Sequence, residues 1–594
     1  MCGIAGFLTN NHSFDKKKVL NKMLEKIKHR GPDADGIYVN KNLYFGHKRL
    51  IVLDPERGAQ PMIHKKKFNY VITYNGEIYN IKQIKKRLFD LNIPIETNCD
   101  TELVLKSYVY LGDNFLDYLN GIFAFAIYDE EKQKIFLARD RFGVKPLFYY
   151  FDQKNFVFAS EIKSLFEFPG IEKKISFNGL QEIFALGPAR TFGNAIFDNI
   201  QELAPGFSLE LKNNNLIKKR YFKLKYMPHT ENIDQTAEHV YFLLKQAVER
   251  QLNSDVPLGT FLSGGLDSSI VSAIAKKKIN DLKTFSLSFE DNQKYFSKSI
   301  LQPDSDDFWA KKTCEFIKTD HYEITLNNFD LANNLELAFF MRDLPGMGDI
   351  DSSLLLFCKE IKNYVTVALS GECADEIFGG YPWFYRNDLN LGNNFFPWMQ
   401  NFDDRENLLK INLDLKNYAR EKYLNLLNDA PEFPENNPEE KNKRDLFYLN
   451  INYFMGNMLE RKDRMSMANG LEVRVPFCDH ELVEYVFNIP WKIKFYNQRE
   501  KGILRRAIEI QNKNILPQEI IWRKKNPYPK TYHPEYEKLI FKLLKQKLKD
   551  NPLNQIIDTK KLFDLIKPKK PWYGQLLSGP QLASYFFQIA CLFD

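Results

Sequence analysis

The 594-residue chain has few of the features that mark several large protein classes. Its 7 cysteines are an odd number, and no two of them form a Cys-x-x-Cys pair. This pattern argues against a disulfide framework and a cysteine-rich zinc site, and it indicates a reducing compartment. Apolar runs such as residues 122–128 have the length of a strand, far short of a membrane span. No charged leader with an apolar run begins the chain, so we expect a cytoplasmic protein.

The chain also has little net charge. Its 83 basic and 76 acidic residues leave a formal charge of +7. This balance argues against a dedicated nucleic-acid surface, and lysine clusters such as residues 65–67 are better interpreted as solvated faces. We therefore expect small-molecule substrates, with no nucleic acid and no membrane as partner.

The pattern of secondary-structure signals changes about one third of the way along the chain. The first part is rich in short apolar runs typical of strands, and from about Asp234 helical and strand patterns alternate. We predict a layered α+β domain over residues 2–212, a linker at 213–233 and an α/β domain with a parallel sheet over 234–594. The proline-containing polar stretch 428–444 resembles a surface excursion, and the tail beyond Asp550 has no clear pattern.

The N-terminus suggests a nucleophile. Cys2 is followed by Gly3, and removal of Met1 would place a free α-amine beside the Cys2 thiol. An α-amine has a pKa near 8 in its unperturbed state, so it can accept the thiol proton and act as the general base of its own residue. Taken alone, a cysteine at position 2 is a weak signal.

Further motifs support that interpretation. They are His29-Arg30-Gly31-Pro32, Gly46-His47-Lys48-Arg49, Tyr74-Asn75-Gly76-Glu77 and Cys99-Asp100-Thr101-Glu102. Each has a structural explanation by itself, since Asn75-Gly76 is a turn signal and Arg49 an ordinary surface charge. Their joint order behind Cys2 resembles the class II glutamine amidotransferases, which have the αββα sandwich of N-terminal-nucleophile hydrolases, across about residues 2–200.

The resemblance implies a role for each residue. Cys2 would attack the side-chain amide of glutamine, and Asn75 with the Gly76 N–H would form the oxyanion hole. Arg49 would bind the substrate α-carboxylate, and Asp100 the α-amino group. Glu77 belongs to the same glutamine-binding set.

A small-residue loop points to a second site. Ser263-Gly264-Gly265-Leu266-Asp267-Ser268-Ser269 lies between an apolar strand and a helix, a context that favours phosphate binding at the helix N-terminus. The loop lacks the Gly-Lys-Ser/Thr ending of a Walker A motif. It resembles the pyrophosphate loop of enzymes that adenylate a carboxylate with ATP, with Asp267 as a ligand for Mg²⁺.

A second loop, Ser370-Gly371-Glu372-Cys373-Ala374-Asp375, follows another strand. Together these segments resemble glutamine-dependent asparagine synthetases over about residues 2–530. The resemblance implies that Glu372 helps ammonia attack the adenylate and that Lys501 neutralises phosphate charge. It also places Asp375 on magnesium, and Phe261, Leu287, Ser370 and Gly371 beside ATP.

The predicted reaction joins the two sites. Glutamine would be hydrolysed at Cys2, and ammonia would pass inside the protein to a carboxylate activated as an acyl-adenylate, giving an amide, AMP and pyrophosphate. Aspartate is the leading acceptor, and a homodimer is expected from the family alone. The family's Thr-Thr-x-Arg stretch is replaced here by residues 344–353, and Cys373-Ala374 is a local variant.

Two alternatives to asparagine synthesis remain open. The enzyme could amidate another carboxylate, such as a sugar acid or a cell-wall diaminopimelate group. β-Lactam synthetases share the architecture but usually lack the N-terminal cysteine, and other Cys2 amidotransferases lack the loop at 263–269. A non-catalytic sensor or scaffold that kept the fold is the remaining possibility.

Overall fold

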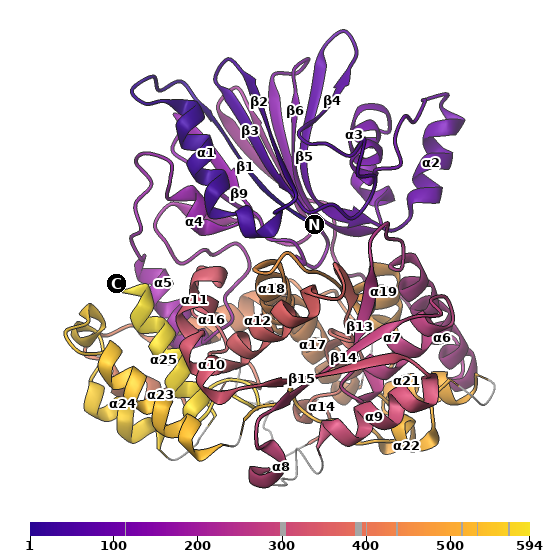
Figure 1. Cartoon of the computed structure of the whole chain (residues 1–594), viewed down its shortest axis with the longest axis vertical. Helices are drawn as coiled ribbons and strands as arrows, with labels where there is room; N and C mark the ends of the chain where they lie inside the picture. Colours follow the sequence, from indigo (N-terminus) through magenta and orange to yellow (C-terminus); the bar gives the residue numbers. More distant parts are fainter. Residues whose placement is uncertain are drawn as a thin grey trace.

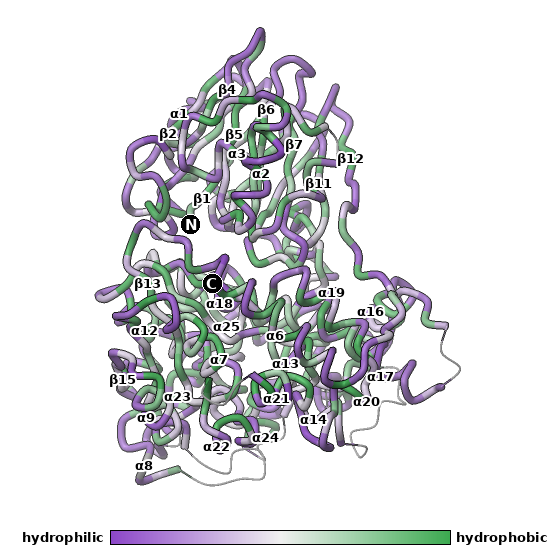
Figure 2. Tube along the Cα trace, turned by 90° about the vertical axis from the view of Figure 1, so that its right-hand side faces the viewer, coloured by the Kyte–Doolittle hydropathy of each residue, from purple (hydrophilic) through white to green (hydrophobic). Residues whose placement is uncertain are grey.

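The computed structural model describes residues 1–112, 114–296, 305–386, 395–399, 401–434, 437–511, 515–531, 533–567 and 571–594. It has two lobes, one formed by the N-terminal third of the chain and the other by the rest (Figure 1). The N-terminus lies between the two lobes. Seen from the side, hydrophobic segments run through both lobes, and hydrophilic segments dominate the outermost loops (Figure 2).

The N-terminal lobe contains two six-stranded antiparallel sheets. The first has the strand order β10-β8-β9-β1-β3-β2, formed by Ile200–Glu202, Phe148–Phe151, Asn155–Ala159, Cys2–Thr9, Leu43–Arg49 and Ala34–Asn40. The second has the order β12-β11-β7-β6-β5-β4, formed by Asn215–Arg220, Phe207–Lys212, Lys134–Arg139, Gly121–Asp129, Asn69–Ile78 and Met62–Lys65.

The two sheets pack face to face, with helices on their outer faces. Residues such as Ile4, Phe45, Ala124, Leu137 and Phe158 form the core between the sheets. Helices α1 (Lys16–Lys26) and α4 (Ile162–Leu165) contact the first sheet, and α3 (Asp100–Tyr110) covers the second together with α2 (Ile81–Asp90). This arrangement confirms the predicted αββα sandwich.

The second lobe is built around a five-stranded parallel sheet of order β15-β14-β13-β16-β17. These strands are Asp320–Leu326, Lys283–Phe289, Leu258–Phe261, Val367–Leu369 and Glu472–Arg474. Nearly every residue of the three middle strands is buried, as expected for a parallel sheet covered by helices. Functional loops follow the carboxyl ends of β13 and β16, where ligands bind in open α/β sheets.

Helices surround this sheet and extend beyond it. The ones that bear on the site are α6 (Ile233–Arg250), α7 (Leu266–Lys276), α9 (Asp306–Ile317), α12 (Asp349–Lys362), α18 (Met455–Met467) and α21 (Gly502–Glu509). Helix α13 (Ala374–Phe378) also contributes residues to the site. Further helices of this lobe are α11 (Leu335–Arg342), α16 (Leu415–Asn428), α19 (His480–Asn488) and α23 (Pro534–Lys547). None of the helices among the described residues combines the length and the apolar character that a membrane crossing requires.

Three features differ from the sequence interpretation. Residues 213–214, placed at the start of the linker, form the turn between β11 and β12, so the second sheet extends to Arg220. Both asparagines of this turn have positive φ, which asparagine tolerates better than most residues. In the polar stretch 428–444, helix α17 (Pro438–Leu449) begins at Pro438, where the ring suits a first helical turn. The unassigned tail forms α24 (Thr559–Ile566) and α25 (Pro580–Leu592).

Candidate active sites

Cys2 begins β1 at the boundary between the lobes. Its backbone nitrogen donates to Oδ1 of Asn75 at 2.9 Å, and its carbonyl oxygen accepts from Nε of Arg30 at 3.1 Å. Strand β1 pairs with β3 so that Cys2 lies opposite Arg49. Burial raises the pKa of the Cys2 thiol, although the N-terminal ammonium and the Leu50 N–H oppose the shift. The thiol is therefore protonated at neutral pH and needs a base to become a nucleophile.

Asn75 and Gly76 lie on β5, next to Cys2. The side-chain oxygen of Asn75 is occupied by the Cys2 N–H, whereas its buried Nδ2 has no hydrogen-bond partner among the described residues. A buried donor without an acceptor is costly unless a ligand supplies the acceptor. At Gly76 a Cβ atom would come 2.3 Å from the Ile122 carbonyl oxygen of β6, so no larger residue fits.

Arg49 ends β3 and is held by three backbone carbonyl groups. Its Nη2 donates to Leu53 O at 3.0 Å and Asp54 O at 2.7 Å, and its Nη1 donates to Pro55 O at 3.2 Å. Gly58 allows this arrangement, because a Cβ there would lie 2.2 Å from Nη2. The guanidinium is thus fixed without a carboxylate partner, and its charge remains available to an anionic ligand.

Two buried carboxylates lie at β5, the strand that carries Asn75. Asp100, at the start of α3, accepts from the Tyr74 hydroxyl at 2.7 Å and from the Ile78 N–H at 2.9 Å. Burial and the neighbouring charges of Glu472 and Asp100 raise the pKa of Glu77, against the opposing effect of Arg474. Like charges buried together favour a bound cation, and the α-ammonium group of an amino acid is such a cation.

The second site is a cavity of about 240 Å³ at the carboxyl ends of the parallel strands. It is lined by nearly all of the predicted ATP-site residues: Phe261, Ser263, Gly265, Asp267, Ser268, Leu287, Ser370, Gly371, Glu372, Asp375 and Lys501. Gly264 is the exception. It has a φ of +70°, and a Cβ there would lie 2.3 Å from the Ala310 nitrogen, so it lets the loop pack against α9.

Lys501 links the two acidic residues of the cavity. Its Nζ lies 2.6 Å from Asp267 Oδ2 and 2.7 Å from Asp375 Oδ1, and Lys525 lies 3.0 Å from Asp375 Oδ2. Burial opposes the charge of Lys501, but the two aspartates outweigh it and raise the pKa of this lysine. The buried Oδ1 of Asp267 has no hydrogen-bond partner among the described residues. A buried carboxylate oxygen that lines the cavity fits a Mg²⁺ ion that shares its ligands with phosphate.

Glu372 lies between two cations of α18. Arg461 Nη2 is 2.8 Å from Glu372 Oε1, and Lys462 Nζ is 3.7 Å from the same oxygen. Burial works against ionisation of Glu372, but these two cations lower its pKa, so it is a carboxylate able to accept a proton. The chain order indicated a basic stretch at 461–464 but gave no sign that it faces Glu372.

The structure also adds residues that the sequence did not assign. Residues 573–576 of the tail line the same cavity, where Tyr573 stacks on Phe454 at 5.5 Å. Lys525 and Arg461 complete its positive wall. In the other site, Arg30 contacts the Cys2 carbonyl, and Glu472 lies beside the N-terminus. The sequence around Glu472, Leu471-Glu472-Val473-Arg474, offers only one signal for this residue, a charge within an otherwise apolar run.

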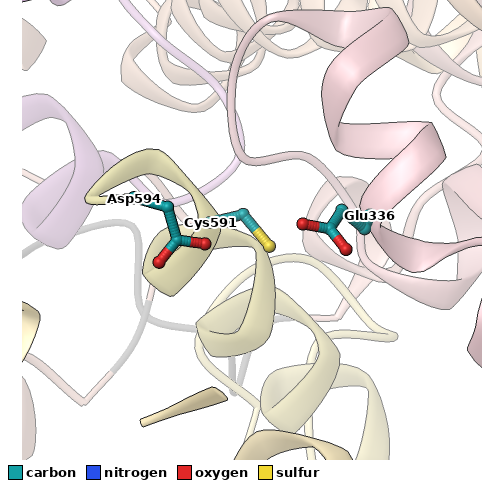
Figure 3. A group of neighbouring side chains, drawn as sticks. All are labelled: Glu336, Cys591 and Asp594. Carbon is teal, nitrogen blue, oxygen red and sulfur yellow. The ribbon is translucent and has the colours of Figure 1, made fainter. Parts of the chain in front are cut away.

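A third group, Glu336, Cys591 and Asp594, brings carboxylates and a thiol together near the C-terminus (Figure 3). Lys547 lies 3.0 Å from Glu336 and 2.5 Å from Asp594, so an ammonium group already neutralises the two carboxylates. We interpret this group as an ion-pair cluster.

The fold and the two sites define an amidotransferase that couples a glutaminase to an ATP-dependent ligase. The family described as Glutamine amidotransferase domain matches residues 1–222, and Asparagine synthase matches 239–583. The chain belongs to the asparagine synthase family. It is 45% identical to glutamine-hydrolysing asparagine synthetase 3 of Bacillus subtilis, over all of this chain and 98% of that protein.

More distant relatives have other names. The human glutamine-hydrolysing asparagine synthetase is 29% identical, over 89% of this chain and 84% of that protein. The amidase chry2 of Gibberella zeae is 27% identical, over 86% of both. Among solved structures, the phosphoribosylpyrophosphate amidotransferase of B. subtilis matches 48% of this chain and 65% of that chain, at 17% identity and a TM-score of 0.29.

Proposed function

We propose that the protein synthesises asparagine from aspartate, glutamine and ATP, with AMP, pyrophosphate and glutamate as the other products. The observation that carries the proposal is the pairing of a Cys2 site and an adenylating cavity in one chain whose relatives are named asparagine synthetases. It extends the family assignment to a particular acceptor.

In the proposed glutaminase step, Met1 is removed and the α-amine of Cys2 accepts the thiol proton. Sγ attacks the amide carbon of glutamine, and the Asn75 Nδ2–H and the Gly76 N–H donate to the developing oxyanion. Arg49 binds the α-carboxylate, while Glu77 and Asp100 bind the α-ammonium group. The C–N bond breaks, the amine returns its proton to the leaving nitrogen, and water later releases glutamate from the thioester.

In the proposed ligase step, the loop at 263–268 and the loop at 370–371 bind the phosphates of ATP, with Phe261 and Leu287 beside the adenine. Asp267 and Asp375 would hold Mg²⁺, which would neutralise phosphate charge, and Lys501 adds a second positive charge at the same place. After the acceptor carboxylate has displaced pyrophosphate, ammonia attacks the acyl carbon of the adenylate, Glu372 takes a proton from the attacking nitrogen, and AMP leaves as the C–N bond of the amide forms.

A second candidate keeps both sites and changes the acceptor. The aromatic wall of Tyr381, Trp383, Phe454 and Tyr573 offers an apolar surface that free aspartate does not need. A larger carboxylate, such as a sugar acid or a diaminopimelate-containing precursor, would use this surface.

The deciding experiment measures AMP formation with ATP, Mg²⁺ and glutamine, with and without aspartate, while asparagine is quantified. Aspartate-dependent AMP in equal amount to asparagine is the expected result. Glutaminase activity with no aspartate-dependent AMP would contradict the proposed acceptor and support the second candidate. Absence of both activities would indicate a non-catalytic protein. The same preparation, analysed by mass spectrometry, tests whether Met1 is removed, and its sedimentation tests the expected dimer.

A further inference from the structure

The second lobe places one carboxylate beside the N-terminus of the chain. Glu472, on β17, accepts a hydrogen bond from the Met1 α-ammonium at 2.7 Å, and both groups are fully buried at the boundary between the lobes. No role in either half-reaction described above requires this residue. Its position raises the question of which nitrogen it holds once Met1 has been removed.

The Glu472 carboxylate is rigidly oriented. Arg474 Nε donates to its Oε1 at 2.6 Å, and the Arg474 guanidinium also donates to the Gln251 carbonyl at 2.6 Å and the Asn253 carbonyl at 2.7 Å. The second oxygen, Oε2, is the one that receives the Met1 ammonium. The pair therefore presents a single preoriented acceptor oxygen toward the nucleophile.

Removal of Met1 would leave Glu472 Oε2 without its hydrogen-bond donor. The backbone nitrogen of Cys2 is already engaged with Asn75 Oδ1 at 2.9 Å, so the new terminus has its own partner. The side chain of Met1 is also buried, with 2% of its surface exposed, and its loss would free space next to Glu472. A buried acceptor oxygen beside free space favours a small donor molecule.

The proposed glutaminase step supplies such a donor at this place. The nitrogen that leaves glutamine is released beside Cys2, and it must travel toward the cavity that contains Glu372. The buried ammonium of Met1 is a stand-in for that nitrogen, because it is a primary amine nitrogen held beside Cys2 by an oxygen of the second lobe.

Strand β17 also leads toward the second site. It pairs in parallel with β16, with Leu369 opposite Arg474, and the Ser370 N–H donates to the Arg474 carbonyl at 2.9 Å. Ser370 begins the loop that carries Glu372. Glu472 therefore lies on the strand that is adjacent to the loop carrying Glu372.

We propose that Glu472, oriented by Arg474, binds the ammonia released at Cys2 and retains it at the boundary between the lobes. This inference rests on the proposed function for the source of the ammonia, but not on the identity of the acceptor. Ammonia donates an N–H to Oε2 and is transferred onward without covalent change. Glu472 is thus a binding residue for the intermediate rather than a residue of either chemical step.

The test uses the full-length protein with Met1 removed, verified by mass spectrometry. In Glu472→Gln, the amide lacks the charge and offers a weaker acceptor. We expect glutamate formation from glutamine, and AMP formation from aspartate with ammonium chloride, to stay within twofold of the wild type, as for a conservative change outside both chemical steps. With glutamine as nitrogen source, glutamate should exceed AMP several-fold, whereas the wild type forms equal amounts. Glu472→Asp should give an intermediate excess.

Glu460→Gln is the matched control. Glu460 is a partly buried glutamate of the same lobe that also pairs across the boundary, with Arg190 at 2.6 Å, and additionally with Arg342 at 3.3 Å. It contacts no residue of the glutamine site, so its variant should keep glutamate and AMP equal. Equal amounts of glutamate and AMP in Glu472→Gln would overturn the proposal, because they would mean that Glu472 does not retain ammonia. A parallel loss of ammonium-dependent AMP formation would also overturn it, because it would indicate a merely structural role.

A second measurement separates this proposal from the proposed function. Crystals of the processed wild type are soaked in rubidium chloride, whose cation is close to ammonium in size. An anomalous peak within hydrogen-bonding distance of Glu472 Oε2, absent in Glu472→Gln, supports the site. If the wild type forms no AMP with aspartate, aspartate is not the acceptor. In that case only the rubidium soak tests whether Glu472 forms a binding site. No peak at that oxygen in the wild type would then overturn it.

Discussion

The glutaminase site and the adenylation site are opposites in charge. Near Cys2, the carboxylates Glu77 and Asp100 are buried close to each other. In the second cavity, Lys501, Lys525, Arg461 and Lys462 surround the acidic residues. We therefore expect the first site to favour the ammonium group of an amino acid and the second to favour a polyphosphate.

The two sites also differ in how they are built. Cys2 and Arg49 are opposite each other on the paired strands β1 and β3, and Asn75 contacts Cys2 from β5 of the other sheet, so all three stand on regular strands. The second cavity is formed by loops after β13 and β16, by the start of α21 and by the tail. A site fixed by strand register has less freedom than one assembled from loops. The four predictions below test this contrast, beginning with the largest expected effect.

Cys2→Ala should separate the two sites completely. Without the thiolate no thioester can form, so we expect glutamine-dependent amide synthesis to fall by about 10⁴-fold or more. Ammonium-dependent synthesis should stay within about twofold, because the second cavity does not include Cys2. Product formation with each nitrogen source measures both. Loss of the ammonium-dependent reaction as well would show that the sites are not chemically independent.

Lys501→Met should have the converse effect. Removal of this ammonium leaves Asp267 and Asp375 without their shared cation, and we expect AMP formation to fall by about 10³-fold with either nitrogen source. Glutamate formation should persist, which also reports that the protein is folded. A variant that still forms AMP at more than a tenth of the wild-type rate would contradict the assigned role.

Asn75→Ala removes the free Nδ2 donor but not the nucleophile. We expect kcat for glutamate formation to fall by about 10²–10³-fold, with a small change in KM, as for loss of one oxyanion donor. Ammonium-dependent AMP formation is the internal control and should not change. A rise in KM with unchanged kcat would instead assign Asn75 to substrate binding.

Glu376→Gln should alter stability rather than chemistry. Burial and the nearby charge of Asp375 raise the pKa of Glu376 to about 8, while the Tyr381 hydroxyl, 2.7 Å from Oε1, opposes the shift. The native state therefore holds a proton that the unfolded state releases above its pKa of about 4.3, and wild-type stability falls as the pH rises toward 8.

The glutamine variant has no such proton to lose. Its free energy of unfolding relative to the wild type should therefore increase by about 1–4 kcal/mol between pH 5 and pH 8. Denaturant unfolding at several pH values measures this difference. A difference independent of pH would show that Glu376 is ionised in the native protein.

Much of this protein was predictable from local sequence. The layered N-terminal domain and the parallel sheet follow from the change between strand and helical patterns, and the αββα arrangement was implied by the resemblance of the motifs that follow Cys2. The residues with the strongest local signatures, Cys2, Asn75 and the loop at 263–268, could be identified because their chemistry requires particular neighbours in the chain. The turn at 213–214 was misplaced because an Asn-rich segment is equally suited to a linker and to a hairpin.

The sequence by itself determined the two folds, the two sets of reactive residues and their order along the chain, because periodicity and short motifs are local properties. Only the tertiary structure decided that Arg461 and Lys462 of α18 face Glu372, and that the tail at 573–576 closes the same cavity. The position of Glu472 beside the N-terminus, 471 residues away in sequence, was also decided there. Such contacts depend on how the two lobes pack, and no pattern within a short stretch of sequence encodes which distant charges will be buried together.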